Sequence, residues 1–208
     1  MIKLEKILGI TAVIGLILKL INISGSGILL ILTLGTLAFL YYPFGFALFN
    51  RIGFRQIFKK KSYEGLSALR IIGSIGAGMA FSVVCSGILF KTLHWPGADF
   101  MLINGLVPTL IVLIIALIKY FKTKGKFYIG ILKRTAIIGT LGLLFVFTSS
   151  LTYVKIRFRN HPDYIKAYEM YLNNPEDEEL LQKLNREYLK TKEDKEEVEM
   201  YPEKKENK

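Results

Sequence analysis

The chain has 208 residues, 51% of them hydrophobic, and a formal net charge of +11. Charge is unevenly spread: residues 1–159 hold 19 Lys and Arg against 3 acids, whereas residues 160–208 hold 9 against 14. This composition excludes an ordinary soluble domain and indicates a basic membrane part followed by an acidic tail.

Five apolar stretches are long enough to cross a bilayer, which takes about 20 residues of helix. The first follows a basic start, MIKLEK, but no A-x-A-like cleavage site follows it, so we expect a retained span rather than a signal peptide. The stretches cover residues 7–23, 27–48, 71–93, 100–118 and 135–154.

These stretches predict an all-α fold, a polytopic helical membrane protein with five transmembrane helices and a short helical C-terminal tail. The expected parts are a first transmembrane hairpin (1–48), a basic cytoplasmic loop (49–70), a second hairpin (71–118), a basic loop (119–134), a fifth transmembrane helix (135–159), an amphipathic helical tail (160–190) and a disordered charged tail (191–208).

Loop charge predicts the orientation. Loops 49–70 and 119–134 hold six Lys and Arg each, whereas the turns near 22–26 and 94–99 hold none. The positive-inside rule then places the amino terminus in the cytoplasm and the tail outside it, although the basic residues at 155–159 argue mildly for the reverse. We attribute the basic loops to attraction by an anionic lipid bilayer, and we expect no nucleic acid partner.

The two hairpins resemble each other. At an offset of 72, GLILKLINISGSGILLIL matches GILFKTLHWPGADFMLIN without a gap. The pattern predicts two copies of one hairpin arranged as parallel repeats, because each copy starts and returns on the same side. The positions that correspond include Gly15 with Gly87, Lys19 with Lys91, Asn22 with His94, and Gly25 with Gly97.

The sequence of the second turn predicts that one helix ends there and the next begins. Pro96 disfavours helix at Trp95, and Gly97 can take the positive φ of a tight reversal. Trp95 belongs at the headgroup level. Asp99 could cap the exposed amides of the next helix and oppose its dipole.

Lys19 and Lys91 lie close to their turns. A Lys at the bilayer centre costs about 2.5–3.5 kcal/mol, so we expect both side chains to snorkel to the interface or to cap the helix end. The alternative is that both ammoniums face inward and bind an anion or a carboxylate; Asp99 could pair with Lys91, but the first copy has Gly27 there.

His94 could relay protons near neutral pH, but hydrogen bonding across the turn is favoured, and Asn22 can do the same in the first copy. No Cys or carboxylate cluster shares a metal-ligand spacing with a histidine, so we expect no metal and no cofactor. We also find no nucleophile-base pair, and we expect no enzyme.

Small residues recur every fourth position along the third span, which gives a smooth face for close helix packing. We expect an internal contact there, with a homo-oligomer contact as the alternative. The face consists of Ser74, Gly78, Ser82 and Ser86.

The tail shows two helix starts, Pro162 with Asp163, and Asn174 with Pro175 and a run of acids. Two short amphipathic helices have little core of their own, so we expect a partner or the bundle to cover them. Residues 191–208 are highly charged, and we expect them to be disordered.

The motif GILFKTLH, the HWPGA turn and FMLINGLV resemble the amino-terminal membrane hairpin of the gliding-motility protein GldL. The resemblance covers about residues 78–118 well and 7–48 weakly, and the matching positions are Gly87, Lys91, His94, Gly97 and Gly105. It implies a helical protein of a bacterial inner membrane. GldL is the ring subunit of a proton-driven motor that works with a periplasm-spanning partner in gliding and type IX secretion.

Motor members of that family carry a Glu inside the second helix, whereas this chain reads GLVPTL there, and no Asp or Glu falls within the five expected spans. The sequence therefore favours an inner-membrane structural or interaction protein that anchors an extracytoplasmic tail and meets a partner through residues 160–190. A motor component or an ion-conducting element is the alternative.

Overall fold

The computed structural model describes residues 1–21 and 23–191. Over these ranges the chain is helical and contains no strand. It divides into two compact units, of which the first is Met1–Thr148 and the second begins at Ser149. Asn22 and residues 192–208, which include nearly all of the tail expected to be disordered, lie outside the described residues.

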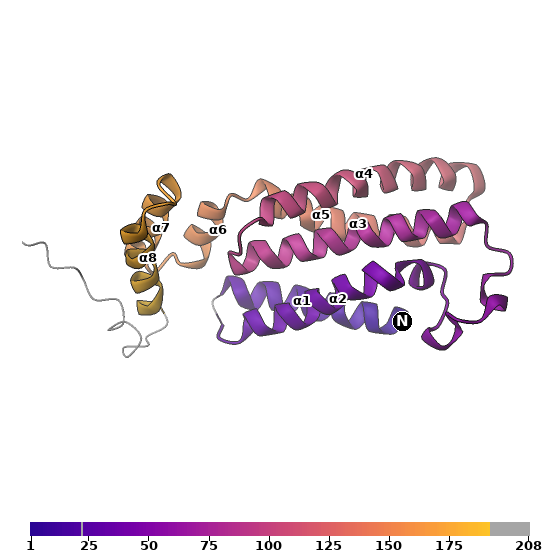
Figure 1. The fold of residues 1–208 in the computed structure, drawn as a ribbon, viewed down its shortest axis with the longest axis horizontal. Coiled ribbons are helices and arrows are strands. Elements are labelled where there is room, and N and C mark those ends of the chain that lie inside the picture. The colour runs from indigo at the N-terminus through magenta and orange to yellow at the C-terminus, as the bar shows by residue number, and fades with distance from the viewer. Residues whose placement is uncertain (22, 192–208) are drawn as a thin grey trace, which may run out of the picture. The chain divides into compact units, whose positions relative to one another are not determined.

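The first unit is a bundle of five long helices that run up and down beside one another (Figure 1). α3 is central, because it packs against α2, α4 and α5, while α1 packs against α2. The helices are α1 (Ile2–Leu20), α2 (Ser26–Phe49), α3 (Ala68–Leu93), α4 (Ala98–Thr123) and α5 (Lys126–Phe147). The α2–α3 loop holds the short 3₁₀ helices η1 (Phe54–Gln56) and η2 (Lys60–Tyr63).

Antiparallel helices give the bundle two ends. We call the end that holds the start of α1, the α2–α3 loop and the α4–α5 turn the basic end. The turns that follow Leu20 and Leu93 lie at the opposite end, which we call the turn end.

Four helices in the described part of the chain, α2 to α5, are long and apolar enough to cross a membrane. α1 is not among them, although a span over 7–23 was expected. The reason is its charge: within 19 residues it carries Lys3, Glu5, Lys6 and Lys19.

The expected fifth span, 135–159, was misplaced. α5 starts at Lys126 and ends at Phe147, so the basic loop expected over 119–134 shrinks to Lys124 and Gly125 between two helices. At the other end, the Ser149 hydroxyl accepts a hydrogen bond from the amide of Thr152 and begins a new helix. An N-cap serine inside an apolar stretch therefore ends the span early.

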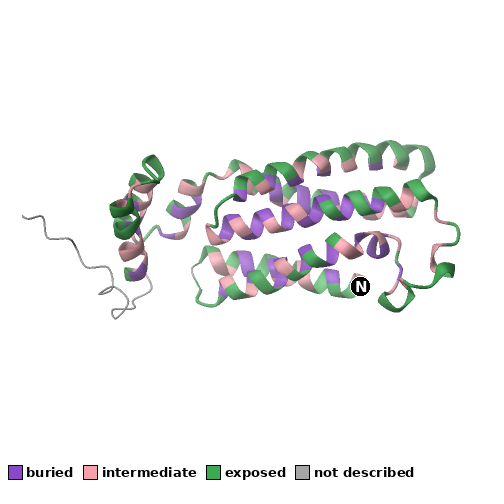
Figure 2. Cartoon of the chain, viewed as in Figure 1, coloured by how far each residue is buried: buried purple, intermediate pink, exposed green. Residues whose placement is uncertain are grey.

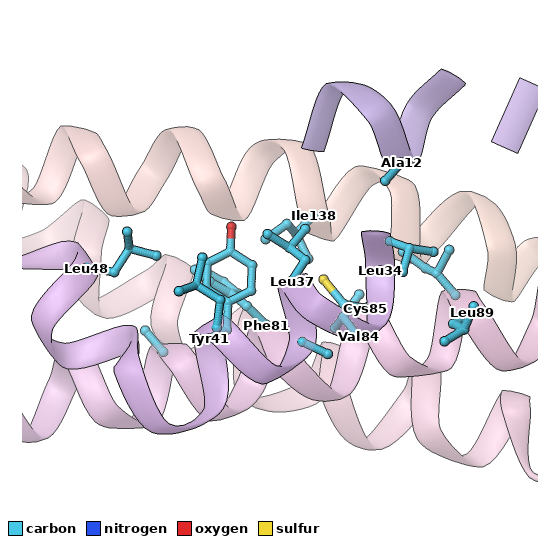
Figure 3. Close-up of a cluster of buried hydrophobic side chains, with 14 of the residues drawn as sticks. Ala12, Leu34, Leu37, Tyr41, Leu48, Phe81, Val84, Cys85, Leu89 and Ile138 are labelled. Carbon is cyan, nitrogen blue, oxygen red and sulfur yellow. The ribbon is translucent and has the colours of Figure 1, made fainter. Parts of the chain in front are cut away.

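Helices α2 and α3 pack through buried side chains such as Tyr41 and Phe81, which Figure 3 labels, and they also touch through glycine. A Cβ added to Gly45 would stand 2.7 Å from the Cα of Gly78, so neither position has room for a side chain. Ser74 is fully buried on the same face of α3 and accepts a hydrogen bond from the Asn50 amide. Ser82 is also buried, whereas Ser86 is partly exposed, so most of the small-residue face is an internal contact.

The two hairpins repeat one contact at the offset of 72. A Cβ on Gly15 would meet the Leu30 side chain at 3.0 Å, and a Cβ on Gly87 would meet Leu102 at 2.9 Å. Both leucines are fully buried. The turns correspond as well, because Gly25 and Gly97 each precede a helix with a φ near +80° (79° and 80°).

The outer face of α4 is exposed within this chain, as Figure 2 shows, and its exposed residues are almost entirely apolar. A row of large aliphatic side chains on a helix that is long enough to span a bilayer is suited to contact with lipid. The row comprises Ile103, Val107, Leu110, Ile111, Ile114, Ile115 and Ile118.

The second unit has a core of its own. α6 (Ser150–Arg157), α7 (Pro162–Asn173) and α8 (Glu178–Lys190) enclose the buried side chains of Val154, Phe158, Tyr164, Ala167 and Leu184. A partner or the bundle was expected to cover the tail helices. Part of their core comes from α6, which we had assigned to the membrane helix over 135–159.

The start of α8 also differs from the expectation. Pro162 opens α7 as predicted, but Asn174 and Pro175 form a turn, and the next helix begins only at Glu178. Its cap is Asp177, whose Oδ1 accepts hydrogen bonds from the amides of Glu179 and Leu180.

Candidate functional site

The α3–α4 turn has the expected geometry. α3 ends at Leu93, and its C-cap, His94, takes the left-handed conformation with a φ of 58°. Gly97, with a φ of 80°, precedes α4. The Trp95 ring is 43% exposed and packs edge-on against Phe90, with ring centroids 5.0 Å apart.

Lys91 is buried and paired. Its side chain is only 4% exposed, and its Nζ donates a hydrogen bond to Asp99 Oδ1 at 2.5 Å. The pairing with Asp99, which sequence reasoning held as the alternative, is thus the arrangement found. Asp99 makes no cap hydrogen bond, but it lies in the first turn of α4, where a carboxylate opposes the helix dipole.

The first turn uses its lysine differently. A Cβ added to Gly27 would be 3.2 Å from Lys19 Nζ, so the ammonium of the first copy lies where Asp99 would stand in the second. The side chain of Leu93, from the end of α3, is 3.4 Å from the same point. Lys19 therefore lies between the two hairpins at the turn end rather than on the outside of α1.

A second polar cluster, which sequence reasoning missed, joins three helices. Glu5 on α1 accepts hydrogen bonds from Arg134 on α5, to Oε1 from Nε at 2.6 Å and to Oε2 from Nη2 at 2.6 Å. The Tyr41 hydroxyl on α2 donates to Oε1 at 2.8 Å. The Arg134 guanidinium also donates to the Gly130 carbonyl and lies 5.2 Å from the Phe49 ring centroid. We call Glu5, Tyr41 and Arg134 the ion-pair cluster.

The ion-pair cluster lies inside the bundle. Tyr41 stands eight residues before the end of α2, and Arg134 eight residues after the start of α5. At 1.5 Å of rise per residue, each is about 12 Å from its helix end. Only 8% of Glu5 is exposed. Glu5 precedes the first expected span, 7–23, and for this reason a search for acids within the spans alone did not find it.

A signal for this pairing was present in the sequence. Arg134 stands in the stretch GILKRTAIIG, with apolar residues on both sides, and a charged side chain within a bundle is paired or faces water. Glu5 is one of only three acids before residue 160. The two residues are 129 positions apart, so nothing local in the sequence pairs them.

The Lys91–Asp99 pair and the ion-pair cluster each consist of oppositely charged groups that bind one another. Each matches a positive group with a carboxylate, and each joins helices: α3 to α4 at the turn end, and α1 to α2 and α5 within the bundle. Among the described residues, no group of three His, Cys, Asp or Glu side chains is placed to hold a metal ion. The geometry therefore fixes helices against one another.

The comparison with protein families agrees with the resemblance noted in the sequence. Residues 72–127 match the family model described as the GldL N-terminal domain. The match covers α3, the turn with Lys91 and Asp99, and α4, whereas the α1–α2 hairpin lies outside it. No curated protein and no solved structure matches the chain.

Proposed function

We propose that this protein is an integral inner-membrane structural protein of the GldL-like type, which anchors a helical unit on the extracytoplasmic side. The observation that carries the proposal is the course of α5. This helix begins at the basic end and finishes at Phe147, and the second compact unit starts at Ser149. A membrane bundle thus connects directly to a folded module of different charge.

Charge at the two ends supports the orientation. The start of α1, the α2–α3 loop and the α4–α5 turn are rich in Lys and Arg, and the turn end is poor in both. The positive-inside rule places the basic end in the cytoplasm. Two of the three basic residues that argued the other way have partners within the second unit: Lys155 Nζ lies 3.9 Å from Glu169, and the Arg157 guanidinium lies 4.5 Å from the Phe158 ring centroid.

The anchoring role is tested by deleting residues 149–208 and isolating the protein from its native membrane in mild detergent. We expect the truncated bundle to insert but to lose a partner that copurifies with the full chain. Deleting residues 192–208 alone is the control, and it should retain the partner. If the 149–208 deletion retains every partner, the second unit is not the adaptor.

The same preparation addresses oligomeric state. Mass measurement of the detergent-solubilised full chain separates a single bundle from a homo-oligomer, and identification of the copurifying proteins shows whether a periplasmic partner is present. We expect the partner to be lost with the second unit and any homo-oligomer to persist without it.

The alternative is a component of a proton-driven gliding or type IX secretion motor, or an ion-conducting element. The match to the GldL N-terminal domain and the charged residues inside the bundle favour it. Its test is ion flux in liposomes with the double variant Lys19→Leu, Lys91→Leu. We expect no flux from the parent; flux that disappears in a folded variant would replace our proposal with this alternative.

We also propose that the protein is not an enzyme and needs no cofactor. Among the described residues, the buried Lys91 pairs with the exposed Asp99, the buried Glu5 pairs with Arg134, and Cys85 is buried in the core. Turnover of any substrate by the purified full chain would overturn this part of the proposal.

A further inference from the structure

We propose that a cavity at the basic end of the bundle binds a phosphate group. The cavity has a volume of about 450 Å³, within the range of ~300–1,000 Å³ that is usual for small-ligand sites. It is formed by the end of α2, the start of α3, the end of α4 and the start of α5. Its walls are Phe49, Asn50, Arg51, Arg70, Thr123, Gly125, Lys126, Phe127 and Tyr128.

The charged residues that line the cavity favour an anion as its ligand. Arg51, Arg70 and Lys126 line it, and none of the described lining residues is acidic. These three cations come from three different helix ends, so they surround a common space instead of following one helix face. Arginine and lysine together are the usual protein partners of phosphate oxygens.

Arg70 is held in place before any ligand arrives. Its Nε donates to Asn50 Oδ1 at 2.7 Å, and its guanidinium lies 4.1 Å from the Phe127 ring centroid. Asn50 is itself fixed, because its amide donates to the Phe46 carbonyl and to the Ser74 hydroxyl. A guanidinium positioned in this way loses little conformational freedom when it binds an anion.

The amino terminus of α5 adds an electrostatic field that favours an anion in the cavity. The N-cap of α5 is Gly125, which makes no side-chain cap hydrogen bond, and both Gly125 and the first helical residue, Lys126, line the cavity. The first amides of a helix and the positive end of its dipole attract anions. This contribution supplements the three cations.

The phosphate has two chemically equivalent sources: the head group of an anionic phospholipid, or a soluble phosphate ester. The cavity lies where the apolar helices end, and the aromatic rings of Phe49, Phe127 and Tyr128 form part of its wall. That position matches the head-group level of the cytoplasmic leaflet in the orientation proposed above. Free phosphate esters of the cytoplasm would reach the same opening, so the test has an arm for each source.

The chain provides a matched pair of variants. Arg51 and Lys124 are both cations with left-handed backbones, with φ values of 63° and 51°, and both lie at the basic end. Only Arg51 lines the cavity, whereas the Lys124 ammonium lies 5.1 Å from the Phe121 ring centroid and 5.2 Å from that of Tyr120. Arg51→Gly and Lys124→Gly each remove one charge and relieve one strained position, so neither is expected to impair folding.

The experiment measures ligand retention by the full chain in neutral detergent with native mass spectrometry. In the lipid arm, dioleoylphosphatidylglycerol is compared with dioleoylglycerol, which lacks the phosphate. In the soluble arm, glycerol 1-phosphate is compared with glycerol. We expect the phosphate-bearing lipid to bind and Arg51→Gly to weaken it roughly tenfold, which corresponds to the loss of a hydrogen bond to a charged group. Lys124→Gly should bind like the parent.

Each outcome decides the matter. If phosphatidylglycerol binding is weakened by Arg51→Gly but not by Lys124→Gly, the lipid is the source of the phosphate. The same pattern for glycerol 1-phosphate, without selective lipid binding, supports the soluble source. Equal losses in both variants, or no preference for either phosphate-bearing ligand, would overturn the proposal.

Discussion

Arg134 illustrates how one residue can decide the position of a helix. A guanidinium inside an apolar helix is costly unless a partner balances it, and Glu5 with Tyr41 provides that balance. The same pairing brings the charged start of α1 into the bundle. Arg134 therefore belongs to α5 and not to the basic loop in which its charge alone would place it.

This pairing predicts a large penalty when one partner is removed. Arg134→Met leaves the buried Glu5 carboxylate without its cation, and we expect a loss of about 3–5 kcal/mol in the free energy of unfolding. The double variant Glu5→Gln, Arg134→Met should recover much of that loss, because no charge then remains buried. The measurement is reversible unfolding in detergent, followed by circular dichroism.

The neighbouring Lys133 offers the control. It is exposed on the same helix, and Lys133→Met should change the unfolding free energy by no more than about 0.5 kcal/mol. Equal effects of Arg134→Met and Lys133→Met would show that the ion-pair cluster does not hold α1 against α5.

The two ion pairs differ in how far the sequence predicts them, and the cause is their separation along the chain. Lys91 and Asp99 lie eight positions apart across a recognisable turn, so their pairing could be considered. Glu5 and Arg134 meet only because five helices pack in one particular order. Burial of Lys91 was also misjudged, since its partner removes the need to reach the interface.

Among the helices, boundaries were predictable where the backbone itself dictates them. The WPG turn ends α3 within a residue or two of the expected position, because proline and glycine limit the available φ values. The α4–α5 turn was not predictable in this way. Its helices continue through Lys122 and Lys126, and helices tolerate lysine well.

Close packing of α3 on α4 predicts that their glycine contact is intolerant of even one methyl group. A Cβ on Gly105 would stand 2.8 Å from the backbone nitrogen of Val84, so Gly105→Ala must push the helices apart. We expect a loss of about 1–3 kcal/mol in the unfolding free energy. Gly76→Ala is the matched change on α3, where nothing lies within 4 Å, and it should be neutral or stabilise by about 0.5–1 kcal/mol. Equal losses would contradict this packing.

The three helices of the second unit should loosen at alkaline pH. Burial raises the pKa of the Tyr164 hydroxyl above its usual value, and the nearby Tyr188 and Tyr168 add to the rise. Because the folded pKa lies above the unfolded value of about 10, this stability is fully present below pH ~10 and is lost as the pH rises through the folded pKa.

Absorbance at 295 nm and circular dichroism of the full chain, recorded against pH, test this expectation. Tyr164→Phe should remove part of the alkaline loss, while Tyr171→Phe, on the same helix, should keep it. An alkaline transition that is identical in the parent and in Tyr164→Phe would contradict the assignment.

For the molecule as a whole, the positions of the two units on the chain predict opposite exposure across the membrane. Cys85 is the single cysteine and is only 2% exposed, so the parent should not react with a membrane-impermeant maleimide. Ser62→Cys, in the α2–α3 loop, should react from the cytoplasmic side, and Asn173→Cys, at the end of α7, from the opposite side. Labelling of inverted and right-side-out vesicles measures this, and reaction of both from one side would rule out the proposed orientation.

Fold class, the family resemblance and four of the expected crossings could be derived from apolar stretches and turn residues. The division into two units could not. Its boundary depends on Ser149 as the N-cap of α6 and on two core residues, Val154 in α6 and Phe158 directly after it. All three fall within the range 135–159 that was assigned to a membrane helix.

The repeated glycine–leucine contact bears on how the bundle assembles. A single hairpin would need a second molecule to build the α2–α3 interface, and such an association weakens on dilution. Joining both copies in one polypeptide makes the encounter intramolecular and independent of expression level. The two hairpins differ at one position beside the turn, where the second has Asp99 and the first has Gly27.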